Sequence, residues 1–177
     1  MNAQAHTQRN ARPASALLRA ALLTGLLSAC AQLPGNFSGV QPGLSTGAQL
    51  RAAQGQPGRV WPNADGTQTL EYPQQPFGTR CMMITVDAND KVLSVLDGLS
   101  PPQRARIEMG MKPEQVSRIL GRERSRVYFS NSNEDVWDWN IEPDQTGYPM
   151  RFNVHFQNGT VLRTSQSMVF PTRPFRD

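Results

Sequence analysis

The clearest pattern of apolar and polar positions in this sequence covers residues 150–156. Apolar residues occupy every second position, namely Met150, Phe152, Val154 and Phe156. The polar residues between them are Arg151, Asn153 and His155. This period of two predicts a β-strand with one buried face, and it places the three polar side chains on the opposite face. Asn158-Gly159 favours a two-residue hairpin turn, so we expect residues 160–166 to return as an antiparallel strand.

A short amphipathic helix is predicted just before Gly121. Val116, Ile119 and Leu120 follow the spacing i, i+3, i+4, which places them on one face of a helix. Pro113 suits the first helical turn, where its missing N–H costs no hydrogen bond. Gly121 suits the left-handed position that often follows a helix end. We therefore expect Val116 and Leu120 to be buried against a sheet.

The same order of features occurs earlier in the chain, displaced by 66 to 70 positions. Gln49-Leu50 matches Gln115-Val116, and the alternating run 82–86 matches 152–156. A drift of a few residues is what insertions in the loops of a duplicated module would produce. Each copy has the pattern of short helices followed by about three antiparallel strands. The predicted fold class is α+β, a tandem repeat of short helices packed on a three-stranded antiparallel sheet.

The first thirty residues have the pattern of a secretory signal. Arg9, Arg12 and Arg19 precede a short apolar run over 20–27, and no acidic residue occurs in this part. The run is much shorter than the ~20 residues that a membrane-spanning helix needs. It ends in Leu27-Ser28-Ala29-Cys30, which resembles the lipobox of bacterial lipoproteins.

The lipobox resemblance implies cleavage before Cys30 and acylation of Cys30, with palmitate among the acyl groups. The alternative is an ordinary signal peptide with a chance cysteine. Ala31 stands where an Asp would resemble an inner-membrane retention signal, so the outer membrane is favoured. The predicted organisation is a signal peptide (1–29), the lipidated cysteine with a flexible tether (30–42), two modules (43–100 and 101–166) and a loose tail (167–177).

Charge and cysteine content change the picture once the signal is removed. The chain has 18 Lys and Arg against 14 Asp and Glu, but the three arginines of the signal would be lost on cleavage. The exported chain is then nearly neutral, and nucleic-acid binding loses its main support. With Cys30 acylated, Cys81 is the one remaining cysteine, so no intramolecular disulfide is expected. We interpret Cys81 as a small apolar strand residue.

The motif Gly110-Met111-Lys112-Pro113-Glu114-Gln115-Val116-Ser117-Arg118-Ile119-Leu120-Gly121, preceded by a lipobox and a tether, resembles the BamE (SmpA/OmlA) family of outer-membrane lipoproteins. That family opens its folded domain with a Gly-Met-Ser/Thr-x-x-x-Val-x-x-x-Leu-Gly helix and continues as a three-stranded antiparallel sheet. Two departures are Lys112 in place of Ser or Thr and the presence of two modules. The doubled arrangement also resembles the β-lactamase inhibitory protein, which binds a protein on its concave sheet.

The resemblance implies a lipid-anchored outer-membrane protein that faces the periplasm and is a non-catalytic accessory of envelope or β-barrel assembly. Its partners would be envelope proteins, including the β-barrel assembly machinery. The alternative is a periplasmic inhibitor or ligand-binding module that uses an exposed sheet face. No enzyme motif such as Gly-x-Ser-x-Gly, a Gly-rich phosphate loop or His-Glu-x-x-His occurs in the sequence. We therefore expect neither catalysis nor a cofactor or metal.

Two surfaces are candidate interaction sites. The first is an exposed sheet face that would bind a protein partner, since exposed apolar groups beside polar ones often indicate such sites. Its residues are Arg151, Asn153, His155 and, from the first copy, Met83. The alternative is that the tail covers this face. The second surface is a basic one that would contact anionic phospholipid beside the membrane, unless it is only a solvated helix surface with ion pairs. Its residues are Arg118, Arg122, Arg124 and Arg126.

Overall fold

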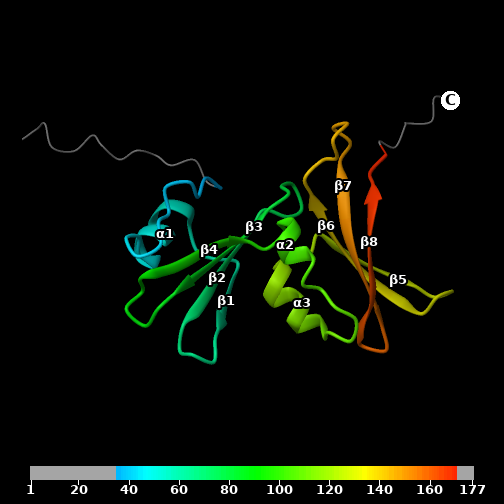
Figure 1. Cartoon of the computed structure of the whole chain (residues 1–177), viewed down its shortest axis with the longest axis horizontal. Coiled ribbons are helices and arrows are strands. Elements are labelled where there is room, and N and C mark those ends of the chain that lie inside the picture. The colour runs from blue at the N-terminus through cyan, green and yellow to red at the C-terminus, as the bar shows by residue number, and fades with distance from the viewer. Residues whose placement is uncertain (1–34, 171–177) are drawn as a thin grey trace, which may run out of the picture. The chain divides into compact units, whose positions relative to one another are not determined.

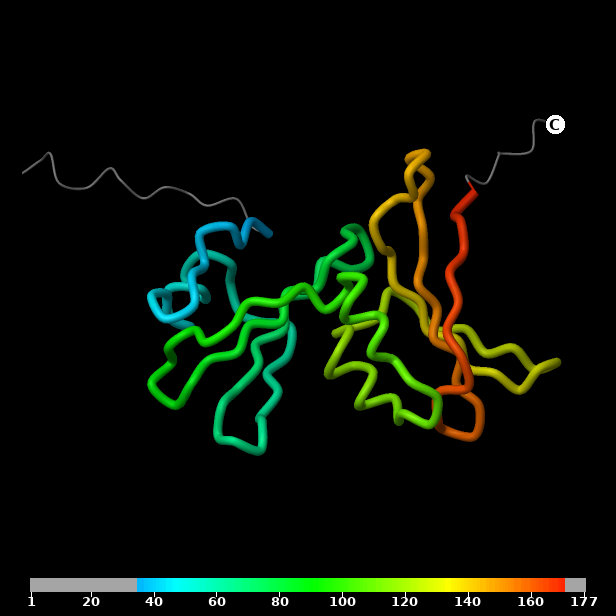
Figure 2. The backbone as a smooth tube through the Cα atoms, in the orientation of Figure 1, coloured from blue at the N-terminus to red at the C-terminus, as the bar shows by residue number. Residues whose placement is uncertain are grey.

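The computed structural model describes residues 35–170. The predicted signal peptide, Cys30 and most of the tail lie outside these residues. The first half contains one helix and four strands, which Figures 1 and 2 trace from cyan to green. They are α1 (Gly47–Gln54), β1 (Arg59–Pro62), β2 (Gln68–Pro73), β3 (Cys81–Val86) and β4 (Val92–Asp97). The four strands form one antiparallel sheet in chain order, the first sheet.

The second half repeats this order of elements after a short extra helix. Its elements are α2 (Pro101–Arg104), α3 (Pro113–Leu120), β5 (Ser125–Phe129), β6 (Glu134–Ile141), β7 (Met150–Gln157) and β8 (Thr160–Met168). The strands again form an antiparallel sheet in chain order, the second sheet. None of the helices in residues 35–170 is long and apolar enough to cross a membrane.

The predicted fold class is wrong. The described chain is mostly β, with two four-stranded antiparallel sheets and a few short helices, and it is not a set of helices on three-stranded sheets. The strands β1 and β5 account for the difference, because each adds an edge strand before the three that were expected. Their sequences lack a period of two: Val127, Tyr128 and Phe129 are consecutive apolar residues, and all three are exposed.

The local predictions for β7 and α3 are confirmed. Phe152, Val154 and Phe156 are buried, and the turn residues Asn158 and Gly159 have φ angles of 51° and 77°. In α3, Val116 and Leu120 are fully buried. The helix ends at Gly121, whose φ of 73° is the left-handed conformation that glycine adopts without strain.

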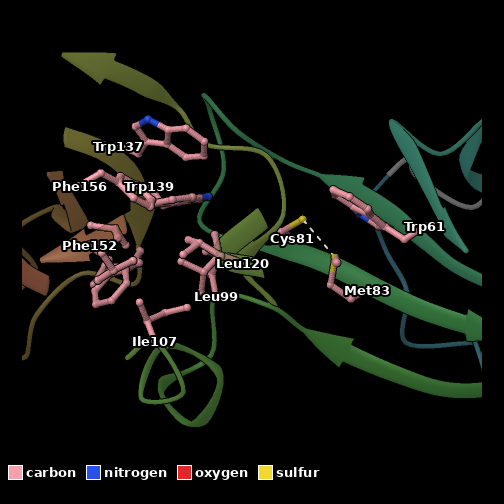
Figure 3. Packing of buried hydrophobic residues seen from close by; sticks show 14 residues of the cluster. Trp61, Cys81, Met83, Leu99, Ile107, Leu120, Trp137, Trp139, Phe152 and Phe156 are labelled. Atoms are coloured by element: carbon pink, nitrogen blue, oxygen red, sulfur yellow. Dashed lines mark hydrogen bonds between the residues drawn. The ribbon is translucent and has the colours of Figure 1, made fainter. Parts of the chain in front are cut away.

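Two hydrophobic clusters hold these elements together. The smaller one packs α1 on one face of the first sheet, through residues such as Leu50, Leu70 and Ile84. The larger one contains α3 and the inner face of the second sheet, and it also includes Trp61, Cys81 and Met83 of the first sheet. Figure 3 shows Leu120 of α3 with Trp139 on one side and Cys81 on the other. The helix α3 therefore packs against both sheets.

Candidate functional site

The first sheet has two covered faces, and this changes one predicted site residue. Cys81 and Met83 point away from α1, as expected, but they are 0% and 5% exposed. They pack against α3 of the second half, and the Cys81 sulfur lies 3.9 Å from the Met83 sulfur (Figure 3). The predicted exposure of Met83 is wrong, because period-two reasoning says which face a side chain points to and not what covers that face.

A buried carboxylate lies in the same junction. Glu71 of β2 is 1% exposed, and its two oxygens accept hydrogen bonds from Trp61 Nε1 at 2.8 Å and from the backbone N–H of Arg122 at 2.7 Å. Buried polar groups are stable only when they have such partners. Glu71 therefore links the first sheet to the residue that follows the C-terminal end of α3.

The corresponding face of the second sheet is polar, and we call it the polar face. Arg151, Asn153 and His155 point to this side of β7, opposite the buried Phe152, Val154 and Phe156, and all three are half-buried. The register places them at the positions that Cys81, Met83 and Thr85 occupy in β3 of the first sheet. The polar face also includes Glu134, Asp138, Arg163 and Ser165. The residue types fit this difference: the face of the first sheet that α3 covers carries apolar Cys81 and Met83, and the polar face of the second sheet remains partly exposed.

A hydrogen-bonded network orients His155 on the polar face. Its Nδ1 lies 2.6 Å from Glu134 Oε2, and its Nε2 lies 2.9 Å from Ser165 Oγ. Arg163 donates from Nη2 to Glu134 at 2.9 Å, and its Nη1 lies 3.0 Å from His155 Nε2. Because arginine can only donate, this geometry fits a neutral His155 that carries its proton on Nδ1 and donates it to Glu134.

The network acts on the titration of Glu134. The hydrogen bond from His155 and the charge of Arg163 together hold the pKa of Glu134 below its usual range, although burial opposes them. Glu134 therefore remains ionised and paired at neutral pH. In the same part of the face, Asn153 Nδ2 donates to Ser165 Oγ and Ser167 Oγ at 3.3 and 3.1 Å.

Arg151 differs from its neighbours on the polar face. Its Nε is the single buried side-chain nitrogen or oxygen of residues 35–170 that has no hydrogen-bond partner. It lines a pocket of about 470 Å³ together with Arg124, Asn140, Phe77 and the residues after Ile141. Gln75 fixes one wall of this pocket, because its Nε2 donates to the Asn140 carbonyl at 2.8 Å and its Oε1 accepts from the Asn140 backbone N–H at 3.2 Å.

Three of the four arginines that were predicted to contact membrane have partners within the protein. Arg118 donates to the Pro62 carbonyl at 3.1 Å, and its Cζ lies 4.8 Å from the centre of the Trp61 ring. Arg124 forms a bidentate ion pair with Asp138, with one N–O distance of 2.8 Å. Arg126 pairs with Glu123 at 2.7 Å and stacks on Trp137. The side chain of Arg122 is exposed, and no hydrogen bond or ion pair to it occurs within the described chain.

No group of three or more His, Cys, Asp or Glu residues within 35–170 could hold a metal ion. The thiol of Cys81 is buried, and burial together with the charges of Glu71 and Asp97 raises its pKa well above the usual range. Cys81 is therefore a packed thiol of the junction. The predicted lipidation site, Cys30, lies outside the described residues.

Some residues of the site were missed by the sequence analysis. Glu134 and Arg163 were not identified as partners of His155, because these contacts depend on the register of three adjacent strands. Glu71 was missed because its isolated carboxylate gives no sequence signal of burial. The sequence does contain an indication that this face of the first sheet is covered: Cys81 and Met83 are apolar at the positions where the second copy has Arg151 and Asn153.

Comparison with known proteins finds weak structural neighbours and no sequence relatives. No protein-family model matches this sequence, and no curated protein sequence matches it. One similar structure is a candidate β-lactamase inhibitor protein from Streptococcus mutans, with 11% identity and a TM-score of 0.29, covering 70% of this chain and 82% of that one. Another is an extracellular protein with an SCP domain from Bacillus anthracis, with 15% identity and a TM-score of 0.28, covering 78% of this chain and 54% of that one.

The first of these neighbours is named after the same inhibitor class that the doubled arrangement resembles. Its identity and TM-score are too low to establish a shared fold or a function for this chain.

Proposed function

We propose that this chain is a lipid-anchored outer-membrane protein, facing the periplasm, that binds a protein partner as a non-catalytic accessory of envelope or β-barrel assembly. The lipobox-like Leu27-Ser28-Ala29-Cys30 and the BamE-like motif from Gly110 to Gly121 support the location and the class. Three acyl chains would hold the protein at the membrane, since each buried CH₂ contributes ~0.8 kcal/mol.

The observation that carries the binding part of the proposal is the difference between the two sheets. In the first sheet, α3 covers the face that contains Cys81 and Met83. In the second sheet, the corresponding face contains Arg151, Asn153 and His155, which are only half-buried among the described residues. A preorganised polar network beside an unpaired guanidinium suits recognition of a protein surface, because its side chains are already fixed before binding.

An affinity pull-down from the cell envelope tests the proposal. The variant is Arg151→Glu with His155→Gln, because glutamine at 155 can still donate to Glu134 whereas a glutamate there would face the Glu134 carboxylate. The matched control is Arg106→Glu, which makes the same change of charge at an exposed position just after α2. We expect the double variant to lose the partner and the control to retain it.

Two results would contradict the proposal. If the double variant melts like the parent and still retains the partner, the polar face is not the surface that binds it. Capture of a single soluble enzyme instead of envelope-assembly proteins would favour the inhibitor function. The anchor is tested separately by labelling with palmitate, which should tag the parent chain and not Cys30→Ser.

A further inference from the structure

The starting point is the unsatisfied guanidinium of Arg151. A guanidinium carries five N–H donors and stays charged at all accessible pH values. Other arginines of the described chain have carboxylate partners, for example Arg124 with Asp138 and Arg163 with Glu134. Arg151 forms no ion pair or side-chain hydrogen bond within residues 35–170, and its Nε is buried. A buried donor without an acceptor costs free energy, and no contact within these residues neutralises the charge of this guanidinium. The part of the Arg151 side chain that lines the pocket is therefore available to bind an anion.

Arg151 lies at the wall of a formed pocket. The pocket has a volume of about 470 Å³, within the range of sites that bind small groups. Its walls come from the loop between β2 and β3, from the residues that join β6 to β7, and from the segment after β8. The apolar wall residues are Pro76, Phe77, Ile141, Pro143, Pro149, Met150 and Val169.

The pocket wall is held in place by side-chain contacts between the two halves of the chain. Asn140 Nδ2 donates to the Pro76 carbonyl at 2.6 Å, next to the paired bonds between Gln75 and the Asn140 backbone. Phe77, which follows Pro76, is 98% exposed. A fully exposed aromatic ring beside an apolar pocket is costly to leave in water, and it suits contact with an apolar group of a ligand.

The charges of the pocket define the ligand further. Arg124 also lines it, but Asp138 already neutralises that guanidinium. One positive charge, that of Arg151, remains without compensation, so a ligand with a single negative charge fits better than a dianion. The planar guanidinium matches a carboxylate in bidentate geometry. The apolar walls begin beside it, so the ligand must carry an apolar group a few bonds from its carboxylate.

We infer that this pocket binds a carboxylate with an adjoining apolar side chain, as at the carboxyl-terminal residue of a polypeptide, with Arg151 as the anion-binding group. The inference deepens the proposed function, on which it rests, because Arg151 belongs to the face proposed to bind a protein partner. It assigns to that partner a free carboxyl end with an apolar last residue.

The test uses N-acetylphenylalanine as the probe and N-acetylphenylalaninamide as the uncharged control. Both are titrated into the full chain in detergent, and two NMR readouts are followed: the Arg151 Nε–H signal, and the backbone amide signals of Phe77 and Asn140 in the pocket wall, which remain observable when Arg151 is replaced. The Arg151 Nε–H signal is assigned by its absence in Arg151→Gln. The acid should shift it with a Kd on the order of 1 mM, as expected for a ligand of this size. The amide and the Arg151→Gln variant should each show at least tenfold weaker binding, whereas Arg106→Gln, at an exposed position outside the pocket, should bind like the parent.

Several outcomes would overturn the inference. Equal shifts with N-acetylphenylalanine and N-acetylphenylalaninamide would show that binding does not depend on the negative charge of the ligand. A tighter response to dihexanoyl phosphatidylglycerol would identify a phosphate ligand instead. An Arg151 signal that is already in the hydrogen-bonded range and does not respond to acid would show that the chain itself supplies the acceptor.

The titration tests the pocket and the pull-down tests the proposed function, so failure of one can be distinguished from failure of the other. A pull-down without a partner, combined with a successful titration, would contradict only the proposed function. A failed titration, combined with loss of the partner in the Arg151→Glu, His155→Gln variant, would contradict only the pocket.

Discussion

The carboxylate of Glu71 accepts a hydrogen bond from the backbone N–H of Arg122 at 2.7 Å, so β2 of the first sheet is bonded directly to the residue after Gly121 at the end of α3. The second oxygen accepts from Trp61 Nε1. This arrangement gives the backbone N–H of Arg122 an acceptor just beyond the helix end, and it neighbours the ring on which Arg118 stacks. The junction between the two halves therefore has a polar centre as well as an apolar one.

Glu71→Ala should lower the free energy of unfolding by about 2–4 kcal/mol, because it leaves the buried Trp61 Nε1–H and the partly buried Arg122 N–H without an acceptor. Glu71→Gln should lose less, since its amide oxygen can replace one of the two acceptors. The matched control is Glu114→Ala, whose exposed carboxylate pairs with Arg118 and should contribute under about 1 kcal/mol. Urea unfolding measures all three. Equal losses for Glu71→Ala and Glu114→Ala would show that the junction does not depend on Glu71.

Gly121 and Gly55 offer a matched pair of glycines. Both follow a helix, with φ angles of 73° and 80°, so alanine at either position bears the same backbone strain. A Cβ at Gly121 would also overlap the sulfur of Cys81, whereas a Cβ at Gly55 meets nothing within 4 Å. Gly121→Ala should therefore destabilise the protein by about 1–3 kcal/mol more than Gly55→Ala.

The double variant Gly121→Ala with Cys81→Ala identifies the cause of this difference. It should recover part of the lost stability, because the smaller side chain at 81 makes room for the new methyl group. Thermal or urea unfolding of the four chains gives the coupling energy between the two positions. Strict additivity of the two substitutions would exclude the overlap as the cause.

Some elements of this structure could be predicted from the sequence and others could not. The strand β7, its hairpin turn and the buried face of α3 follow from patterns of a few adjacent residues, which local geometry determines. The strands β1 and β5 were missed as separate strands, since an edge strand with apolar groups on both faces has no period of two. Met83 shows the main limit: the sequence predicts its face, but the packing of α3 on that face is a long-range event.

The same limit applies to the candidate site. Arg151, Asn153 and His155 lie on the face where the alternation places them, and that part needed no structure. The network of His155 with Glu134 and Arg163 depends on strand register, and the pocket beside Arg151 depends on a loop of the first half that packs against Asn140. Neither can be obtained from the spacing of residues in one segment.

Acid should destabilise the protein partly through Glu134. The hydrogen bond from His155 and the charge of Arg163 lower the pKa of Glu134 in the folded state below its usual 4.5. A folded-state pKa below the unfolded one gives stability that is present above about pH 4.5 and is lost as the pH falls through the lower value. Glu134→Gln should therefore show a flatter decline of stability from pH 5 to about pH 3 than the parent.

The control for this pH dependence is Glu114→Gln on the exposed surface of α3, which should decline in parallel with the parent chain. Urea unfolding at several pH values measures the slopes. Identical slopes for Glu134→Gln and the parent would show that the hydrogen bond from His155 and the ion pair with Arg163 do not contribute to acid stability.

The remaining membrane prediction concerns Arg122. Arg118, Arg124 and Arg126 already donate to Pro62, Asp138 and Glu123, respectively, so part of the hydrogen-bonding capacity of each is used within the protein. The exposed side chain of Arg122 has no partner within the described residues. A basic residue beside an anionic surface contributes ~1 kcal/mol, which corresponds to about a fivefold change in binding. Arg122→Ala should therefore reduce co-sedimentation of the Cys30→Ser chain with phosphatidylglycerol vesicles about fivefold.

Two further variants make this test specific. Arg106→Ala removes an exposed arginine of another segment and should leave vesicle binding unchanged. Arg124→Ala should lower thermal stability, because it leaves the buried carboxylate of Asp138 without its ion pair, and it should not alter vesicle binding at temperatures where the chain stays folded. If vesicles without phosphatidylglycerol bind equally well, or if Arg106→Ala and Arg122→Ala weaken binding equally, then the basic surface serves solvation and ion pairing, and Arg122 has no specific contact with lipid.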